Sequence, residues 1–142
     1  MELDFLVESL KSYYLNKTEV IFGYLFGSYA KNRARKDSDL DLGIYLSNYQ
    51  KEAAYNYKLE ETEELQRLYG KEVDLILLNE APPLLRHEIL KFGILVKEPE
   101  QQFLVKYKVK SFYQYLDQLY IVDRLFEKNK AKIQGEDSNG IN

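Results

Sequence analysis

The chain has 142 residues, of which 45% are hydrophobic and 30% are charged, and its formal net charge is −3. This length fits one domain with its own core, and the composition is that of an ordinary globular protein. No apolar run approaches the roughly 20 residues of a membrane span, and the N-terminus has the features of neither a signal nor a transit peptide. The chain has no cysteine, so disulfides and thiolate metal sites are excluded. We therefore expect a cytoplasmic protein without stable nucleic-acid binding.

The first quarter of the chain predicts a helix and then a strand. Apolar residues recur at three- and four-residue steps across Leu3–Tyr14, which is typical of one amphipathic helix. Thr18–Phe26 is β-branched and aromatic and precedes a glycine, so we expect a buried strand. Gly27 and Ser28 then turn the chain into a short basic segment, Tyr29–Lys36.

A second strand is predicted over Asp39–Ser47. Its alternation places four aliphatic residues on one face: Leu40, Leu42, Ile44 and Leu46. The other face begins with two carboxylates, Asp39 and Asp41. Two like charges on one face of a strand repel each other, so this pair requires a reason.

The middle of the chain continues the alternation of helix and strand. Lys51–Tyr69 is predicted as a charged helix, with the glutamates of Glu60–Glu64 on a solvated face that could also meet a basic partner. Glu72–Asn79 is predicted as a third strand, with Asp74 near its start. A short helix is expected from the two prolines to Leu90, followed by a short edge or fourth strand over 94–97.

A long helix is predicted from about Gln101 to Lys130. Six apolar residues step along it by three and four: Val105, Val109, Phe112, Leu116, Leu119 and Phe126. The tyrosines of this helix are expected mostly in the core: Tyr107, Tyr113, Tyr115 and Tyr120. Tyr115 and Tyr120 cannot both face inward together with this stripe unless the helix is nearly engulfed, so a partner surface is the alternative. Residues 135–142 are expected to be a disordered tail, which leaves 1–134 as a single domain.

Strands separated by helices predict an α/β (α+β) fold, in which a small mixed β-sheet is flanked by helices and followed by a long C-terminal helix. If the second and third strands are neighbours, Asp39, Asp41 and Asp74 converge. Their mutual repulsion would push at least one of them towards the protonated state. A hard divalent cation removes this conflict, and ligands that are all oxygen suit Mg²⁺ better than Zn²⁺. Two such ions, about 4 Å apart, could clamp an in-line attack on a phosphate.

Gly27 and Ser28 are candidate phosphate-binding residues, because a glycine at the end of a strand lets the backbone approach a phosphate and serine adds a hydroxyl donor. Lys31 and Arg33 could neutralise a triphosphate. Each feature alone has a simpler interpretation, such as a capped turn or a solvated loop. Together and in this order, they predict transfer of a nucleotidyl group from a nucleoside triphosphate.

Gly27-Ser28, ten intervening residues and Asp39-Leu40-Asp41 resemble the GS-x10-D-x-D signature of the polymerase-β-like nucleotidyltransferase superfamily. The short chain is similar to the minimal nucleotidyltransferases, and specifically to the MntA-like antitoxins encoded beside HEPN-domain toxins. The likeness spans roughly residues 20–98. It implies a Mg²⁺-dependent enzyme that transfers AMP from ATP to a tyrosine of its cognate HEPN ribonuclease toxin and thereby neutralises it.

By position, the resemblance implies that Asp39 and Asp41 are ligands of two Mg²⁺ ions. Asp74 would be the third carboxylate, which helps to bind metal and accepts the proton of the incoming hydroxyl. Gly27 and Ser28 would cradle the phosphates.

Two positions depart from the family pattern. Relatives often have arginine where this chain has Tyr29, which removes a phosphate contact for which Lys31 or Arg33 could substitute. They often have glycine where this chain has Asn32, and asparagine tolerates the left-handed backbone that such a turn needs. His87, the only histidine, is expected at a partly exposed surface position.

Two other functions stay open from the sequence. One is an antitoxin that inhibits the toxin by binding alone, without catalysis. The other is nucleotidyl transfer to a small molecule or to RNA, although enzymes of that kind usually carry an additional domain.

Overall fold

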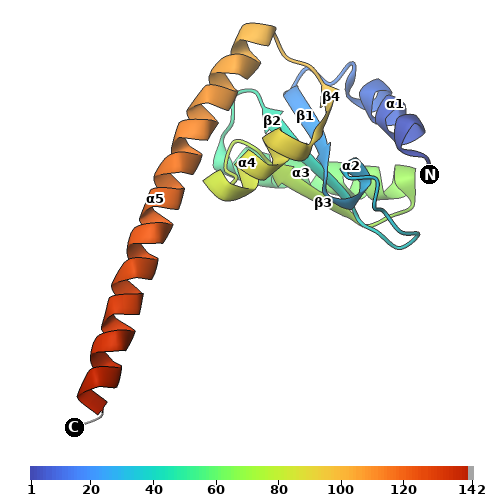
Figure 1. Cartoon of the computed structure of the whole chain (residues 1–142). Helices are drawn as coiled ribbons and strands as arrows, with labels where there is room; N and C mark the ends of the chain where they lie inside the picture. The colour runs from blue at the N-terminus through green and yellow to red at the C-terminus, as the bar shows by residue number, and fades with distance from the viewer. Residues whose placement is uncertain (141–142) are drawn as a thin grey trace.

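The computed structural model describes the backbone of residues 1–140 and the side chains of residues 1–133. The elements follow in the order α1 (Leu3–Tyr14), β1 (Val20–Phe26), α2 (Gly27–Ala30), β2 (Leu40–Leu46), α3 (Lys51–Tyr69), β3 (Val73–Leu77), α4 (Pro83–Phe92), β4 (Ile94–Lys97) and α5 (Gln101–Gly140). The predicted class, a small mixed sheet flanked by helices with a long C-terminal helix, is confirmed (Figure 1).

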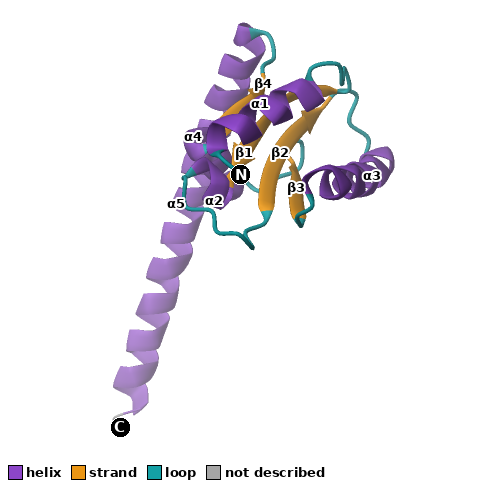
Figure 2. Ribbon diagram, turned by 90° about the vertical axis from the view of Figure 1, so that its right-hand side faces the viewer, coloured by secondary structure: helices purple, strands orange, loops and turns teal. Residues whose placement is uncertain are grey.

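The four strands form one sheet in the order β3-β2-β1-β4. β1 is antiparallel to both β2 and β4, whereas β2 is parallel to β3. The parallel pair requires a crossover connection, which α3 supplies. This arrangement brings the starts of β2 and β3 to the same edge of the sheet (Figure 2).

Helices cover both faces of the sheet, so the strands carry apolar side chains on each side. α1 and α3 pack on one face, where the aliphatic residues of β2 join Leu10 and Leu65 in the larger core cluster. α4 and α5 pack on the other face, where Phe22 and Tyr45 stack with ring centroids 5.2 Å apart. The alternation read from the second strand is therefore correct.

The inner face of α5 differs from the predicted stripe. Leu104 and Tyr107 pack against the second core cluster, and Ser111 is buried. The expected core position is thus confirmed for Tyr107 and wrong for Tyr113 and Tyr120, which are exposed. The six residues of the predicted stripe, Val105, Val109, Phe112, Leu116, Leu119 and Phe126, are exposed instead. The helix can turn Tyr107 inward because its hydroxyl donates a hydrogen bond to the carbonyl oxygen of Leu78 at 2.9 Å.

α5 is also longer than predicted and projects from the body of the protein (Figure 1). It runs past Lys130 to Gly140, and Ala131 and Lys132 are good helix formers. The side chains of the expected disordered tail, 135–142, lie outside the described residues, and so does the backbone of 141–142. The tail and the 1–134 domain boundary therefore stay predictions. Within the described part of the chain, no helix combines the length and apolarity needed to cross a bilayer.

One glutamate of α3 that was expected in solvent is buried. Glu61 is only 3% exposed, and its Oε2 atom accepts a hydrogen bond from Lys17 Nζ at 3.1 Å. The expectation of a solvated face is wrong at this position because α1 and the residues after it cover this side of α3. Lys17, which follows α1, brings the opposite charge that such burial requires.

Candidate functional site

The starts of β2 and β3 bring two of the predicted site residues together. In the parallel pairing of these strands Asp41 lies opposite Asp74. Side chains in register on neighbouring parallel strands point to the same face, which here is the face covered by α4 and α5, because Tyr45 and Ile76 on the same alternation belong to that core. Asp39 directly precedes β2. We call Asp39, Asp41 and Asp74 the acidic edge.

The acidic edge shows the electrostatic crowding expected of three carboxylates. The pKa of Asp41 is raised from 3.8 to about 6, first because partial burial disfavours its charge and then because the charges of Asp74 and Asp39 repel it. Asp39 and Asp74 are themselves exposed. Of the three aspartates, Asp41 is therefore the one whose ionised form is destabilised in the folded protein.

Gly27 lies against Asp41 at the end of the neighbouring strand. Phe26, the last residue of β1, is paired with Asp41, so the chain turns directly beside the carboxylate. Gly27 has a φ of 72°, a conformation that residues with a Cβ rarely adopt. A Cβ atom on Gly27 would also overlap Oδ2 of Asp41 and lie 2.9 Å from its Cγ. The glycine is thus required by the turn and by the carboxylate together.

The turn after Gly27 is short and closed by backbone hydrogen bonds. α2 consists of four residues, so it supplies one helical turn beside the acidic edge and not a long helix dipole. Ser28 is half-buried within it. The N–H of Arg33 donates to the carbonyl oxygen of Ser28 at 2.8 Å. Asn32 has a φ of 54°, so the predicted left-handed backbone at this position is confirmed.

The basic residues of this segment are held in place less firmly than Gly27. The side chains of Lys31 and Arg33 are exposed. Lys31 Nζ lies 3.4 Å from Oε1 of Glu88 on α4, and an exposed pair of this kind is weak and can rearrange. Tyr29 is only 5% exposed and belongs to the core, so its side chain does not face the acidic edge as a phosphate ligand would. Nothing in the local sequence pattern indicates that this tyrosine is a core residue.

The donor types at the acidic edge fit Mg²⁺, because carboxylate oxygens are the ligands that hard cations prefer. The charges of Asp74 and Asp39 also add to the effect of burial in raising the pKa of Asp41. Among the described residues, however, no group of three or more His, Cys, Asp or Glu side chains is close enough together to hold a metal ion. Ligation of Mg²⁺ by all three aspartates therefore remains a proposal.

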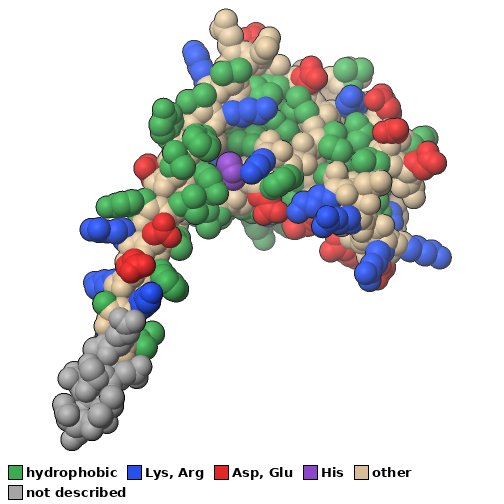
Figure 3. All heavy atoms as spheres, viewed as in Figure 1, with side chains coloured by type: hydrophobic (Ala, Val, Ile, Leu, Met, Phe, Trp, Pro, Cys, Tyr) green, Lys and Arg blue, Asp and Glu red, His purple; other side chains and the backbone are tan. Residues whose placement is uncertain are grey.

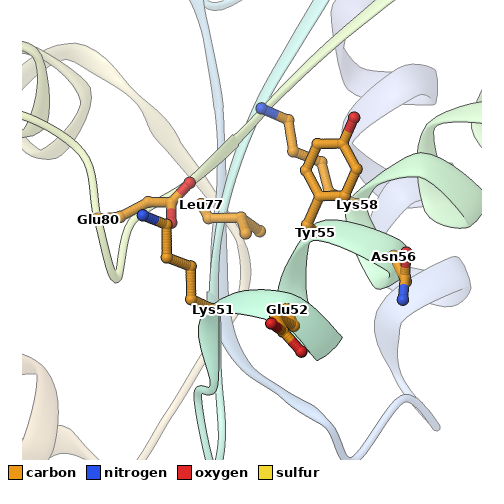
Figure 4. Close-up of a pocket in the computed structure, with 7 residues that line it drawn as sticks. All are labelled: Lys51, Glu52, Tyr55, Asn56, Lys58, Leu77 and Glu80. Carbon is orange, nitrogen blue, oxygen red and sulfur yellow. The ribbon is translucent and has the colours of Figure 1, made fainter.

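A separate hollow lies at the opposite end of the strands, where α3 begins (Figure 4). It is lined by Lys51, Glu52, Tyr55, Asn56, Lys58, Leu77 and Glu80. Leu77 is the last residue of β3, whereas Asp74 stands near its first residue. This hollow is therefore no part of the acidic edge. His87 is also elsewhere: it is half-buried, as predicted, and stacks on Tyr115 with ring centroids 3.7 Å apart.

Residues 8–102 match the family model described as polymerase beta, nucleotidyltransferase. A solved toxin–antitoxin structure with AMP-PNP is similar to this chain at 22% identity and a TM-score of 0.65, covering 89% of this chain and 99% of that one. A chain from a complex of tri-AMPylated Shewanella oneidensis HEPN toxin with MNT antitoxin is 22% identical, with a TM-score of 0.58 and coverage of 84% and 98%.

A structure described as a minimal nucleotidyltransferase is 28% identical, with a TM-score of 0.53, and covers 66% of this chain and 95% of that one. No curated protein matches the sequence.

Proposed function

This chain belongs to the polymerase β nucleotidyltransferase family, and we propose that it acts as an antitoxin by transferring AMP from ATP to a tyrosine of a HEPN-domain toxin. Family membership confirms the predicted enzyme class. The finer proposal is supported by the similarity to a toxin–antitoxin structure with AMP-PNP and to a complex of AMPylated HEPN toxin with MNT antitoxin. We place the reaction in the cytoplasm.

The single observation that carries the proposal is the register of Asp41 with Asp74 beside the Gly27 turn. Asp39, Asp41 and Asp74 would hold Mg²⁺, which when bound would offset their repulsion and draw negative charge from the triphosphate. Gly27 would let the backbone approach the phosphates, and the Ser28 hydroxyl would donate to a phosphate oxygen. Lys31, released from Glu88, and Arg33 would neutralise the leaving pyrophosphate.

The proposed reaction is an in-line displacement at the α-phosphorus of ATP. The tyrosine oxygen of the toxin forms a bond to the α-phosphorus, and the bond from that phosphorus to the oxygen of the leaving pyrophosphate breaks. Asp74 accepts the proton of the tyrosine hydroxyl, because it is exposed and able to meet an incoming side chain. Asp41 lies between Asp74 and Gly27, on the side of the site where the phosphates of the nucleotide would bind.

The proposal is tested with ATP labelled at either the α- or the γ-phosphorus, in the presence of Mg²⁺ and the cognate HEPN toxin. AMP transfer predicts that the α-label appears on the toxin and the γ-label does not. The variant carrying Asp39→Asn and Asp41→Asn should fold and transfer neither label. Appearance of the γ-label would instead show phosphoryl transfer and would refute the proposal.

One observation favours a second candidate, an antitoxin that works by binding alone. The side chain of Tyr29 lies in the core, so position 29, where relatives often have arginine, supplies no cation of its own to the phosphates. This candidate predicts that the wild-type protein blocks the ribonuclease activity of the toxin without ATP. The catalytic proposal predicts that inhibition requires both ATP and Mg²⁺ and persists after the two proteins are separated.

A further inference from the structure

The outer face of α5 carries an apolar seam that the described chain leaves uncovered. The seam consists of Val105, Val109, Phe112, Leu116, Leu119, Phe126 and Ile133, whose exposed fractions lie between 37% and 64%. Steps of four and three alternate along it, with Asp123 and Lys130 occupying the two positions that complete the series. This is the spacing of the a and d positions of a coiled coil, which bury against another helix.

The body of the protein uses a different face of the same helix. Leu104, Tyr107 and Ser111 make the contacts with the body of the protein. The seam therefore lies on a different side of α5 from these contacts. The C-terminal half of α5 extends beyond α4 and the sheet (Figure 1). Hydrophobic side chains follow this helix on the face seen in Figure 3. An exposed apolar surface of this extent marks an interaction site.

We propose that this seam docks a helix of the protein that accepts the nucleotidyl group. The inference rests on the proposed function, since it takes the acceptor to be the cognate toxin, and it adds the surface by which that toxin is held. The heptad spacing specifies a helix as the occupant, because only a second helix presents knobs at the matching interval. Docking on α5 leaves the acidic edge, on another part of the molecule, free for the reacting tyrosine.

The two charged residues of the seam argue against a second copy of this chain as the occupant. Asp123 and Lys130 occupy a positions, and the apolar residues Phe112, Leu119 and Phe126 occupy d positions. In a parallel pair of identical helices in register, a positions face each other, so Asp123 would meet Asp123 and Lys130 would meet Lys130. In an antiparallel pair, a positions face d positions, so both charges would be buried against apolar side chains. Neither arrangement neutralises them.

A different helix can satisfy both charges. It would place a basic residue opposite Asp123 and an acidic residue opposite Lys130, as a polar a position selects its partner in other coiled coils. Two lysines, Lys106 and Lys108, occupy the e and g positions that flank the N-terminal end of the seam. The partner helix therefore carries acidic residues opposite this end.

The first test measures binding of the full chain to the cognate HEPN toxin by calorimetry, without ATP. Leu119→Gln changes the centre of the seam. Ile121→Gln is the matched control, because Ile121 is 50% exposed but lies two residues further along and hence on the opposite side of the helix. We expect Leu119→Gln to weaken binding by about tenfold or more and Ile121→Gln to leave it unchanged.

The outcomes separate this inference from the proposed function. Equal binding by wild type and Leu119→Gln, with AMP transfer intact, overturns the docking surface alone. Absence of any binding or transfer by the wild type overturns the proposed function and the inference with it. A wild-type chain that forms a dimer in analytical ultracentrifugation, and loses it on Leu119→Gln, assigns the seam to a second copy and overturns the partner helix.

A second variant tests the role of the two charges. Asp123→Leu combined with Lys130→Leu makes the seam apolar throughout, so the variant should self-associate at concentrations where the wild type is monomeric, and it should bind the toxin more weakly. If the double variant stays monomeric and binds the toxin as the wild type does, Asp123 and Lys130 do not select the partner.

Discussion

The carboxyl group of Asp41 occupies the space that a side chain on Gly27 would need. A Cβ atom on Gly27 would overlap Oδ2 of Asp41 and lie 3.2 Å from its Cβ. These residues belong to the two halves of the sequence motif, which are separated by ten residues and are brought together by the pairing of β1 with β2. The fixed spacing of the motif thus corresponds to a direct contact in the fold.

Gly27→Ala should displace Asp41 and strongly reduce AMP transfer. The added Cβ must move either the turn or the carboxylate, and a φ of 72° is strained for alanine. We expect a loss of about 1–2 kcal/mol in the free energy of unfolding, measured by urea denaturation alongside the transfer rate.

Gly70→Ala is the matched control. Gly70 has a φ of 63°, but nothing lies within 4 Å of the added Cβ. The Gly70→Ala variant should lose about 1 kcal/mol in the free energy of unfolding and keep the full rate of AMP transfer. Equal activity of the two alanine variants would show that the contact between Gly27 and Asp41 is not needed for transfer.

Asp41→Asn should stabilise the metal-free protein while abolishing transfer. The pKa of Asp41 in the folded protein is about 6, against an ordinary value of 3.8. Between these values the folded state binds more protons than the unfolded state, so stability falls as the pH rises from about 4 to about 6. Because Asp41 is only partly buried, we expect a gain of about 1 kcal/mol for Asp41→Asn at pH 7.

The measurement is urea denaturation in EDTA across this pH range. The dependence on pH should be weaker in Asp41→Asn than in the wild type. Asp117→Asn, which changes an exposed carboxylate on α5, should leave the dependence unchanged. A wild-type protein whose stability rises between pH 4 and pH 6 through Asp41 would contradict the combined effect of burial and neighbouring charges on this carboxylate.

Lys17→Met should destabilise the protein by about 3 kcal/mol, because it leaves the carboxylate of Glu61 buried without its cation. Glu61 is 3% exposed, and its Oε1 atom has no hydrogen-bond partner within the described residues. The double variant Lys17→Met with Glu61→Leu should recover most of the loss, because it removes both charges. A single variant as stable as the wild type would show that the pair is not effectively buried.

Tyr107→Phe should lower the free energy of unfolding by about 1 kcal/mol. It removes the hydrogen bond that the Tyr107 hydroxyl donates to the carbonyl oxygen of Leu78, so this oxygen loses its side-chain donor. This bond joins α5 to the sheet. Tyr113→Phe changes a tyrosine of the same helix that is 64% exposed, and it should have no effect on thermal unfolding. Equal melting temperatures for the two variants would argue that α5 is held by apolar packing alone.

Much of the fold could be read from the sequence because the local patterns are strong. The bounds of α3 and β4 agree with the structure, since α3 ends at a left-handed glycine, Gly70, and β4 lies between Gly93 and Pro99. The strand order and the parallel pairing of β2 with β3 could not be read from the sequence, because they depend on contacts between segments far apart in the chain. The convergence of Asp41 with Asp74 was conditional on that pairing.

The inward face of α5 could not be predicted because two apolar stripes run along the helix. The more regular stripe, which includes Leu116 and Leu119, is exposed, and the inner one uses Tyr107 and Ser111, which periodicity does not identify as core. Glu61 shows the same limit, because nothing in a run of glutamates indicates which one meets Lys17. In each case the deciding interaction lies between elements that are distant in sequence.

Calorimetric titration with AMP-PNP, in Mg²⁺ and in EDTA, tests the acidic edge most directly. We expect that the wild type binds the analogue only with Mg²⁺ and that Asp41→Asn loses this binding although it folds more stably. Binding that is equally strong in EDTA, or unchanged in Asp41→Asn, would contradict the assignment of Asp39, Asp41 and Asp74 as the metal and nucleotide site.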